Sequence, residues 1–282
     1  MLRIVMDSAG DLPEEWIQEY EIEVIPINIH LGEDVRLENV TLNIDQFYQW
    51  VEKTGQIPKS SQPSPQQCLT FYRRIADPGD VILSIHLTSK LSGTYESAVI
   101  ASRELEGELK VIPFDTLSGT AIQGYMCCEA RAMDRKGASI NQILDRLKTI
   151  RENTEVIFTL NSLDFARMSG RVQMLESLLA SLLKIKPIVI LKEGTLSIGH
   201  KVRTRKASLE YLLQETARRV GKNLVNAAVI HAHDLISAEM FAERVKKIIN
   251  TKQFFIEELS IGIAANLGPG TIGIVAYPAG EG

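Results

Sequence analysis

Short apolar runs alternate with amphipathic stretches through the first half of the chain. The runs at 2–8, 80–86 and 109–115 have the length and the composition of buried strands. Each is followed by a segment whose apolar residues have helical spacing. Strands that alternate with helices predict a parallel sheet with right-handed crossovers. A further apolar run at 21–37 reads as a strand that turns back at 32–34.

Helix starts are marked by capping residues. Asp11 and Glu14 predict one start, with an acid as the N-cap and a second acid three residues later. Ser64 predicts another, because Pro65 stands at the first helical position and Gln67 completes a capping box. The spacing of apolar residues predicts three more helices, at 43–54, about 118–135 and 139–153.

The second half has a different order of elements. A strand is predicted at 155–160, and a sequence with helical spacing follows it. Two further strands come next and are predicted to form a hairpin that turns at Glu193-Gly194. A hairpin within alternating helices and strands predicts a mixed or antiparallel sheet. We therefore expect two α/β domains with a boundary near Asn153: a parallel-sheet domain at 1–153 and a mixed or antiparallel domain at 154–282.

Bulk properties exclude some classes of protein. The 282 residues carry a net charge of −4, which argues against non-specific electrostatic binding of nucleic acid. The cysteines, Cys68, Cys127 and Cys128, form no C-x-x-C pair and suit a reducing cytoplasm. Asp7 interrupts the N-terminal apolar run, so we expect no signal peptide. Lysines interrupt the most apolar stretch, so we expect no integral membrane segment.

Hydroxyl side chains gather in two loops of the predicted parallel-sheet domain. Ser92, Gly93 and Thr94 lie where a strand gives way to a helix, and Ser60 and Ser61 lie a short way upstream. The carboxyl ends of parallel strands share one edge of a sheet, so we expect the loops that follow the strands to converge. Helix N-terminal N–H groups and these hydroxyls would form an anion cradle. The alternative is that the hydroxyls only cap helices, which is our interpretation of Ser64.

Other motifs lead to weaker hypotheses. The stretch 268–273, GPGTIG, matches a dinucleotide-binding fingerprint, but a sequence typical of a strand follows it where the fingerprint requires a helix. The acid that the fingerprint requires about 20 residues further on would lie beyond Gly282. His231 and His233 alternate, so we expect them on one strand face, although without a third ligand a metal site is not expected. The stretch 200–206, HKVRTRK, predicts a basic strand face, either solvated or available to a partner; it comprises Lys201, Arg203 and Arg205.

An ordered set of motifs resembles the DegV family of fatty-acid-binding proteins. It runs along nearly the whole chain as DSAGDLP, SSQPSP, LTSKLSGTYESA, FDTLSGTAIQGY, SGRV, LLKIKPI, VRTRKA and GPGTIG. The resemblance implies two α/β domains with a fatty acid buried between them. It implies that Ser60 and Ser92 bind the carboxylate of the fatty acid. It also implies that Arg171 takes part in the reaction with a kinase partner. Where the family commonly has a histidine before the last glycine loop, this chain has Asn266, which can hydrogen-bond but carries no charge.

The leading hypothesis is a carrier, not an enzyme. It would bind a long-chain fatty acid and present the carboxyl group to the catalytic subunit of a separate ATP-dependent fatty acid kinase, with no cofactor and no metal. The expected carboxylate-binding residues are Ser60, Ser61, Ser92, Gly93, Thr94 and Asn266. Two alternatives stay open. One is a phosphotransferase or hydrolase with Ser92 as nucleophile, and the other is a regulator that senses lipid.

Overall fold

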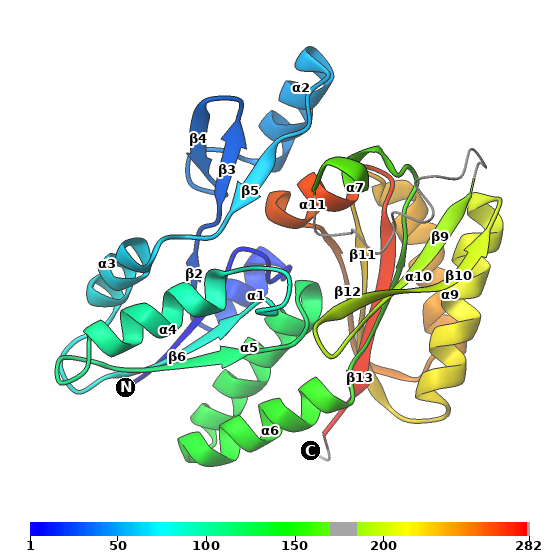
Figure 1. Ribbon diagram of the computed structural model, residues 1–282. Helices are drawn as coiled ribbons and strands as arrows, with labels where there is room; N and C mark the ends of the chain where they lie inside the picture. Colours follow the sequence, from blue (N-terminus) through cyan, green and yellow to red (C-terminus); the bar gives the residue numbers. More distant parts are fainter. Residues whose placement is uncertain (170–184, 281–282) are drawn as a thin grey trace. The chain divides into compact units, whose positions relative to one another are not determined.

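The computed structural model describes residues 1–169 and 185–280. The chain forms two compact units, each built around its own sheet (Figure 1). The first unit comprises Met1–Arg151 together with Ser260–Gly262, and the second comprises the rest of the chain from Glu152 onward. Three residues from late in the sequence therefore belong to the unit that the first half of the chain builds.

The main sheet of the first unit has four strands in the order β2-β1-β6-β7, and every neighbouring pair is parallel. Parallel strands of this kind are buried on both faces, which explains their nearly continuous apolar sequences. The strands are β1 (Leu2–Asp7), β2 (Ile22–Ile25), β6 (Val81–His86) and β7 (Lys110–Asp115). The parallel sheet predicted from the alternation of strands and helices is confirmed.

Helices cover both faces of this sheet. On one face α3 and α4 pack over a core that includes Tyr72, Ile82 and Ala98 (Figure 1). On the other face the ring of Trp16 in α1 meets that of Tyr125 in α5 edge to face, with centroids 5.9 Å apart. The helices in this part of the sequence, of which α2 lies beside a second sheet described below, are α1 (Glu14–Glu19), α2 (Ile44–Thr54), α3 (Pro65–Ile75), α4 (Thr94–Glu104), α5 (Thr120–Arg135) and α6 (Ile140–Glu152) (Figure 1).

The structure confirms one predicted helix start and corrects another. Ser64 caps α3: its hydroxyl accepts the N–H of Gln67, whose side chain accepts the N–H of Ser64 in return. Asp11 does not cap α1, so that prediction was wrong. The N-cap of α1 is Pro13, which has no side-chain hydrogen bond, and the carboxylate of Asp11 instead accepts the N–H of Ser260 at 2.8 Å.

A second, smaller sheet in the first unit was not predicted. The predicted turn at 32–34 is present, but the run 21–37 divides between two sheets instead of forming one strand that turns back. After β2 the chain forms β3 (Asn28–Leu31) and β4 (Asp34–Leu37), and β3 also pairs with β5 (Lys59–Ser61). All three strands are antiparallel to their neighbours. This sheet carries Ser60 and Ser61, which are central to the predicted site.

The second unit contains a six-stranded mixed sheet in the order β10-β9-β8-β13-β11-β12. Only β11 and β12 run parallel, and the other neighbours are antiparallel. The predicted hairpin is present, because β9 turns into β10 at Glu193-Gly194, where both residues have positive φ. The strands are β8 (Glu155–Thr159), β9 (Lys186–Lys192), β10 (Thr195–Val202), β11 (Val225–His231), β12 (Thr251–Glu258) and β13 (Ile272–Pro278).

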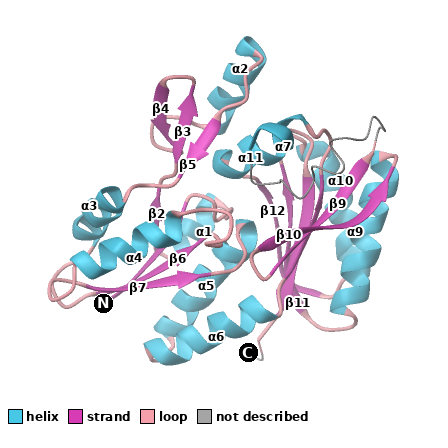
Figure 2. Ribbon diagram, in the orientation of Figure 1, coloured by secondary structure: helices cyan, strands magenta, loops and turns pink. Residues whose placement is uncertain are grey.

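Figure 2 shows helices packed along the strands of the mixed sheet. Two of them, α9 and α10, bury Leu212, Leu213 and Phe241 in an apolar core with the strands. The described helices of this unit are α7 (Asp164–Ser169), α9 (Arg205–Val220), α10 (Leu235–Ile248) and α11 (Ile261–Leu267), whose first residues belong to the first unit. Of the helices within 1–169 and 185–280, none combines the length and the apolar character that crossing a bilayer requires.

Candidate functional site

The loops that follow the strands of the parallel sheet are joined to one another by hydrogen bonds. The N–H of Leu87, after β6, donates to the carboxylate of Asp7 at the end of β1 over 3.0 Å. The hydroxyl of Ser89 donates to the carboxylate of Asp115 at the end of β7 over 2.6 Å. The predicted convergence of these loops at one edge of the sheet is confirmed.

Ser92 and Thr94 form a hydroxyl pair at the start of α4. Their oxygens lie 2.8 Å apart, and the hydroxyl of Ser92 also accepts the N–H of Thr94 at 3.3 Å. Thr94 is buried, whereas Ser92 and Gly93 are half-buried. The N-cap residue Gly93 has no side chain to accept the N–H groups of the first turn. Donors at a helix start that lack a side-chain cap are available to an anion.

Ser60 and Ser61 project from β5. Ser61 Oγ lies 2.8 Å from Nε2 of His30, on the neighbouring strand β3. Ser60 Oγ donates to the carbonyl of Gly262 at the long distance of 3.5 Å. Both hydroxyls are half-buried. Neither residue caps a helix. Helix capping, which explains the hydroxyl of Ser64, therefore does not explain Ser60 and Ser61.

The two hydroxyl loops meet through the residue that follows β5. A Cβ atom added to Gly93 would lie 2.8 Å from Nε2 and 3.0 Å from Cδ of Gln62. The end of β5 and the start of α4 are therefore in direct contact within the first unit. The contact is made by Gln62, which follows Ser60 and Ser61, and by Gly93, which follows Ser92.

Sequence reasoning missed a buried chain of polar side chains beneath these loops. Asp7 Oδ2 lies 3.0 Å from Nδ1 of His86, and Nε2 of His86 lies 2.8 Å from Oγ of Ser84. Ser84 Oγ in turn lies 2.8 Å from the hydroxyl of Tyr72. All four side chains are fully buried. Ser84 and His86 are two residues apart on one strand and so share a face, which was the available signal.

This chain bears on the hypothesis of a hydrolase that uses Ser92. A serine nucleophile needs a base within hydrogen-bond reach. Among the described residues the His86–Asp7 pair bonds to Ser84 and not to Ser92, whose hydroxyl pairs with Thr94. Ser84 has the partners of a nucleophile but is fully buried. The geometry therefore favours a binding role for Ser92.

A second missed residue is Glu38, which is only 1% exposed. Its carboxylate accepts the hydroxyl of Ser8 at 2.5 Å and the N–H of Gly262 at 3.2 Å. Burial raises the pKa of Glu38 to about 7, against the lowering effect of these hydrogen bonds. It follows exposed residues of β4, so nothing in the sequence pattern marks it as buried.

The two remaining site candidates lie elsewhere in the chain. Asn266 is a half-buried residue of α11 in the second unit. Arg171 falls outside the described residues. After α11 the GPG loop runs through Gly268 and Gly270, both with positive φ, and β13 follows instead of a helix. The rejection of a dinucleotide fingerprint is confirmed, because that fingerprint must open a helix.

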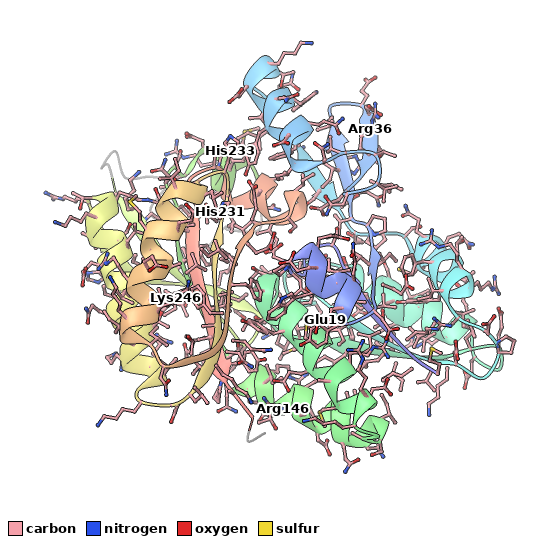
Figure 3. The ribbon with its side chains drawn as sticks, turned by 180° about the vertical axis from the view of Figure 1, so that it is seen from behind. Glu19, Arg36, Arg146, His231, His233 and Lys246 are labelled. Atoms are coloured by element: carbon pink, nitrogen blue, oxygen red, sulfur yellow. The ribbon has the colours of Figure 1, made fainter. Side chains whose placement is uncertain are left out.

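The prediction that His231 and His233 share a strand face was wrong. Strand β11 ends at His231, which is buried, and His233 turns away with a φ of 52° (Figure 3). Burial lowers the pKa of His231. Within the described ranges, no three or more His, Cys, Asp or Glu side chains are grouped so as to bind a metal ion.

The predicted basic strand face was also wrong. Lys201 lies on β10, but the strand ends at Val202, and Arg203 belongs to the turn that follows. Arg205 is the first residue of α9, and its Nη2 donates to the carboxylate of Asp234 at 2.8 Å. The three cations therefore belong to a strand, a turn and a helix, because the alternating pattern continued past the end of the strand.

Comparison with known proteins identifies the family. Residues 1–279 match the family described as "Uncharacterised protein, DegV family". A DegV domain-containing protein of Halalkalibacterium halodurans is 32% identical over 280 residues, 98% of each chain. A solved fatty-acid-binding DegV family protein from Thermus thermophilus is 28% identical, with a TM-score of 0.89 over 99% of both chains.

A stearic-acid-binding protein from Eubacterium ventriosum is 25% identical, with a TM-score of 0.92 over 99% of this chain and 98% of the other. The fold therefore agrees along its whole length with proteins that are described as binding fatty acids. The match of the family to nearly every residue and the agreement of the folds lead to one conclusion: this chain is a member of the DegV family.

Proposed function

We propose that the protein binds a long-chain fatty acid and holds its carboxylate with hydroxyl and backbone donors of the first unit. The residues of this unit assigned to the carboxylate are Ser60, Ser61, Ser92, Gly93 and Thr94. The single observation that carries the proposal is the contact between Gln62 and Gly93, which unites the two hydroxyl loops. The fatty-acid-binding descriptions of the solved relatives support it.

The chemistry of the cradle suits a carboxylate. Removing a charged oxygen from water is costly unless hydrogen bonds replace the lost hydration. Each hydrogen bond to a charged group contributes about 1.5–3 kcal/mol. The acyl chain supplies the remaining affinity, at about 0.8 kcal/mol for each buried methylene. The hydroxyls would thus orient the head group, while the chain length would set the strength of binding.

In this proposal the protein is a cytoplasmic carrier and not an enzyme. It presents the bound carboxyl group to the catalytic subunit of a separate ATP-dependent fatty acid kinase. The arrangement around Ser92 supports a non-catalytic role, because the buried His86–Asp7 pair is bonded to another serine. Arg171 is assigned to the phosphorylation step, in which the kinase acts on the bound fatty acid.

The test is the lipid content of the purified protein. Native mass spectrometry should show a retained ligand, and solvent extraction should release a long-chain fatty acid. After the lipid is removed, added oleate should bind and raise the melting temperature, since a ligand of the folded state stabilises it. Methyl oleate, which has no carboxylate, is the control and should bind more weakly. Protein that is purified without lipid and does not respond to oleate would overturn the proposal.

A further inference from the structure

Gly93 is a glycine at a position where backbone conformation does not require one. Its φ is −81° and its ψ is 6°, and other residues adopt this conformation readily. Gly55 shows the contrasting case, because its φ is 66° and a Cβ there would meet nothing within 4 Å. At Gly93 a Cβ atom would instead meet the amide group at the end of the Gln62 side chain, which would have to move away.

Gln62 has a fixed backbone and an unengaged side chain. Its carbonyl accepts the side-chain amide of Asn28 at 3.0 Å, and β5 ends immediately before it. Its side chain is exposed, and among the described residues the hydrogen bond recorded for Gln62 is the one to its backbone carbonyl. The nearby Gln67 differs, because its amide bonds to both Asn28 and Ser64. Gln62 therefore places a free amide against the start of α4.

The amide lies beside Gly93, one of the residues assigned to the carboxylate. It follows Ser60 and Ser61 directly in sequence and touches the residue between Ser92 and Thr94. A side-chain amide offers two N–H donors and carries no charge. Such a group can replace part of the hydration of a carboxylate without adding a second ionised group to the site.

We propose that Gln62 is a further carboxylate-binding residue, which donates an N–H to the fatty acid beside the hydroxyl of Ser92. In this arrangement Gly93 is a glycine because any side chain would displace the Gln62 amide from the head group. The inference rests on the proposed function, since it names an additional ligand-binding residue for the same site.

The decisive variant is Gln62→Glu, which keeps the shape of the side chain but replaces the donor with a negative charge. Affinity for oleate should fall about tenfold or more, because a charge-assisted hydrogen bond is lost and two carboxylates are brought together. Affinity for oleyl alcohol, which has no charge, should change less than twofold. Gln66→Glu is the matched control: it adds the same charge at the exposed second residue of α3, and oleate affinity should stay within twofold of the wild-type value.

A double-mutant cycle tests the coupling of Gln62 with Gly93. Gly93→Ala should weaken oleate binding about fivefold to tenfold in the wild-type background and have little effect when Gln62 is already alanine. Melting temperatures of all variants confirm that they fold. An equal effect of Gly93→Ala in both backgrounds, or equal oleate affinities for Gln62→Glu and Gln66→Glu, would overturn the inference alone. Wild-type protein that does not bind oleate would overturn the proposed function as well.

Discussion

The hydroxyl of Ser8 lies 2.5 Å from Oε2 of Glu38, and both side chains are buried in the first unit. The acid receives donors from two distant parts of the sequence, because the N–H of Gly262 also donates to it. Burial nevertheless dominates, and the nearby carboxyl of Asp7 adds a small effect in the same direction, so the pKa of Glu38 rises to about 7. Ionisation of Glu38 is therefore linked to the stability of the fold.

We predict that this single acid makes the free energy of unfolding depend on pH. The folded pKa of about 7 exceeds the unfolded value of 4.5. The unfolded chain therefore loses the proton first as pH rises, and stability falls between these two values and is level above pH 7. The change amounts to about 3 kcal/mol. Urea denaturation across pH 4 to 8 measures it.

The variant Glu38→Gln removes the ionisation and keeps the shape of the side chain. The difference in the free energy of unfolding between wild type and Glu38→Gln should change by about 3 kcal/mol across that pH range. Glu33→Gln alters an exposed acid of the same turn region and should show no such change. A wild-type minus Glu38→Gln difference that is constant from pH 4 to pH 8 contradicts the prediction.

The carboxylate-binding assignment predicts that Ser60→Ala and Ser92→Ala each weaken fatty acid binding by about 1–2 kcal/mol, the loss of one hydrogen bond to a charged group. Calorimetry with oleate measures the loss. Ser64→Ala is the matched control, because that hydroxyl caps α3. It should cost about 1 kcal/mol of stability and leave oleate affinity unchanged. Equal affinities for wild type and a Ser60→Ala/Ser92→Ala double variant would place the carboxylate elsewhere.

Replacement of the buried acid in Asp7→Asn should destabilise the protein by about 3 kcal/mol, because Asp7 accepts hydrogen bonds from three groups, including the ring of His86. Asp77→Asn, at an exposed position of the same unit, should change stability by less than about 0.5 kcal/mol. Chemical denaturation of the two variants compares them. Similar midpoints for both would show that the buried chain contributes little.

The kinase-linked role makes separate predictions for Asn266 and Arg171. If presentation needs only a bound carboxyl group, Asn266→Ala should weaken oleate binding and Asn266→His should change acyl phosphate formation little. Arg171→Ala should reduce phosphorylation much more than oleate affinity, since a guanidinium supplies fixed positive charge. A steady-state assay with candidate kinases measures both. Wild-type protein that is inactive with every kinase but is rescued by Asn266→His would contradict this interpretation, because a positioned acid or base is typically worth about 10²–10⁴-fold.

Local patterns predicted the elements whose causes are local. The capping box at Ser64, the hairpin at Glu193-Gly194 and the buried parallel strands all depend on residues within a few positions of one another. The convergence of the loops after β1, β6 and β7 also followed, because parallel strands must end at one edge of their sheet. The convergence of these loops was therefore accessible from the sequence, and the hydroxyl cradle stays a prediction.

Features that depend on distant partners were missed or wrong. Asp11 has the spacing of an N-cap, yet its partner is the N–H of Ser260, 249 positions later. Glu38 stands among exposed residues, and its donors come from Ser8 and Gly262. The alternation of His231 and His233 failed because a strand ended between them, which pattern alone does not reveal.

The inclusion of Ser260–Gly262 in the first unit has a consequence for the order in which the protein is made. A ribosome releases the first 151 residues long before residue 260 emerges. During that interval Asp11 and Glu38 lack the backbone N–H groups that they accept in the finished fold. A buried acceptor without its donor is costly, so we expect the first half alone to be less stable than the same unit in the finished chain. The first unit is therefore completed only by residues 260–262, which are synthesised after the whole stretch 152–259.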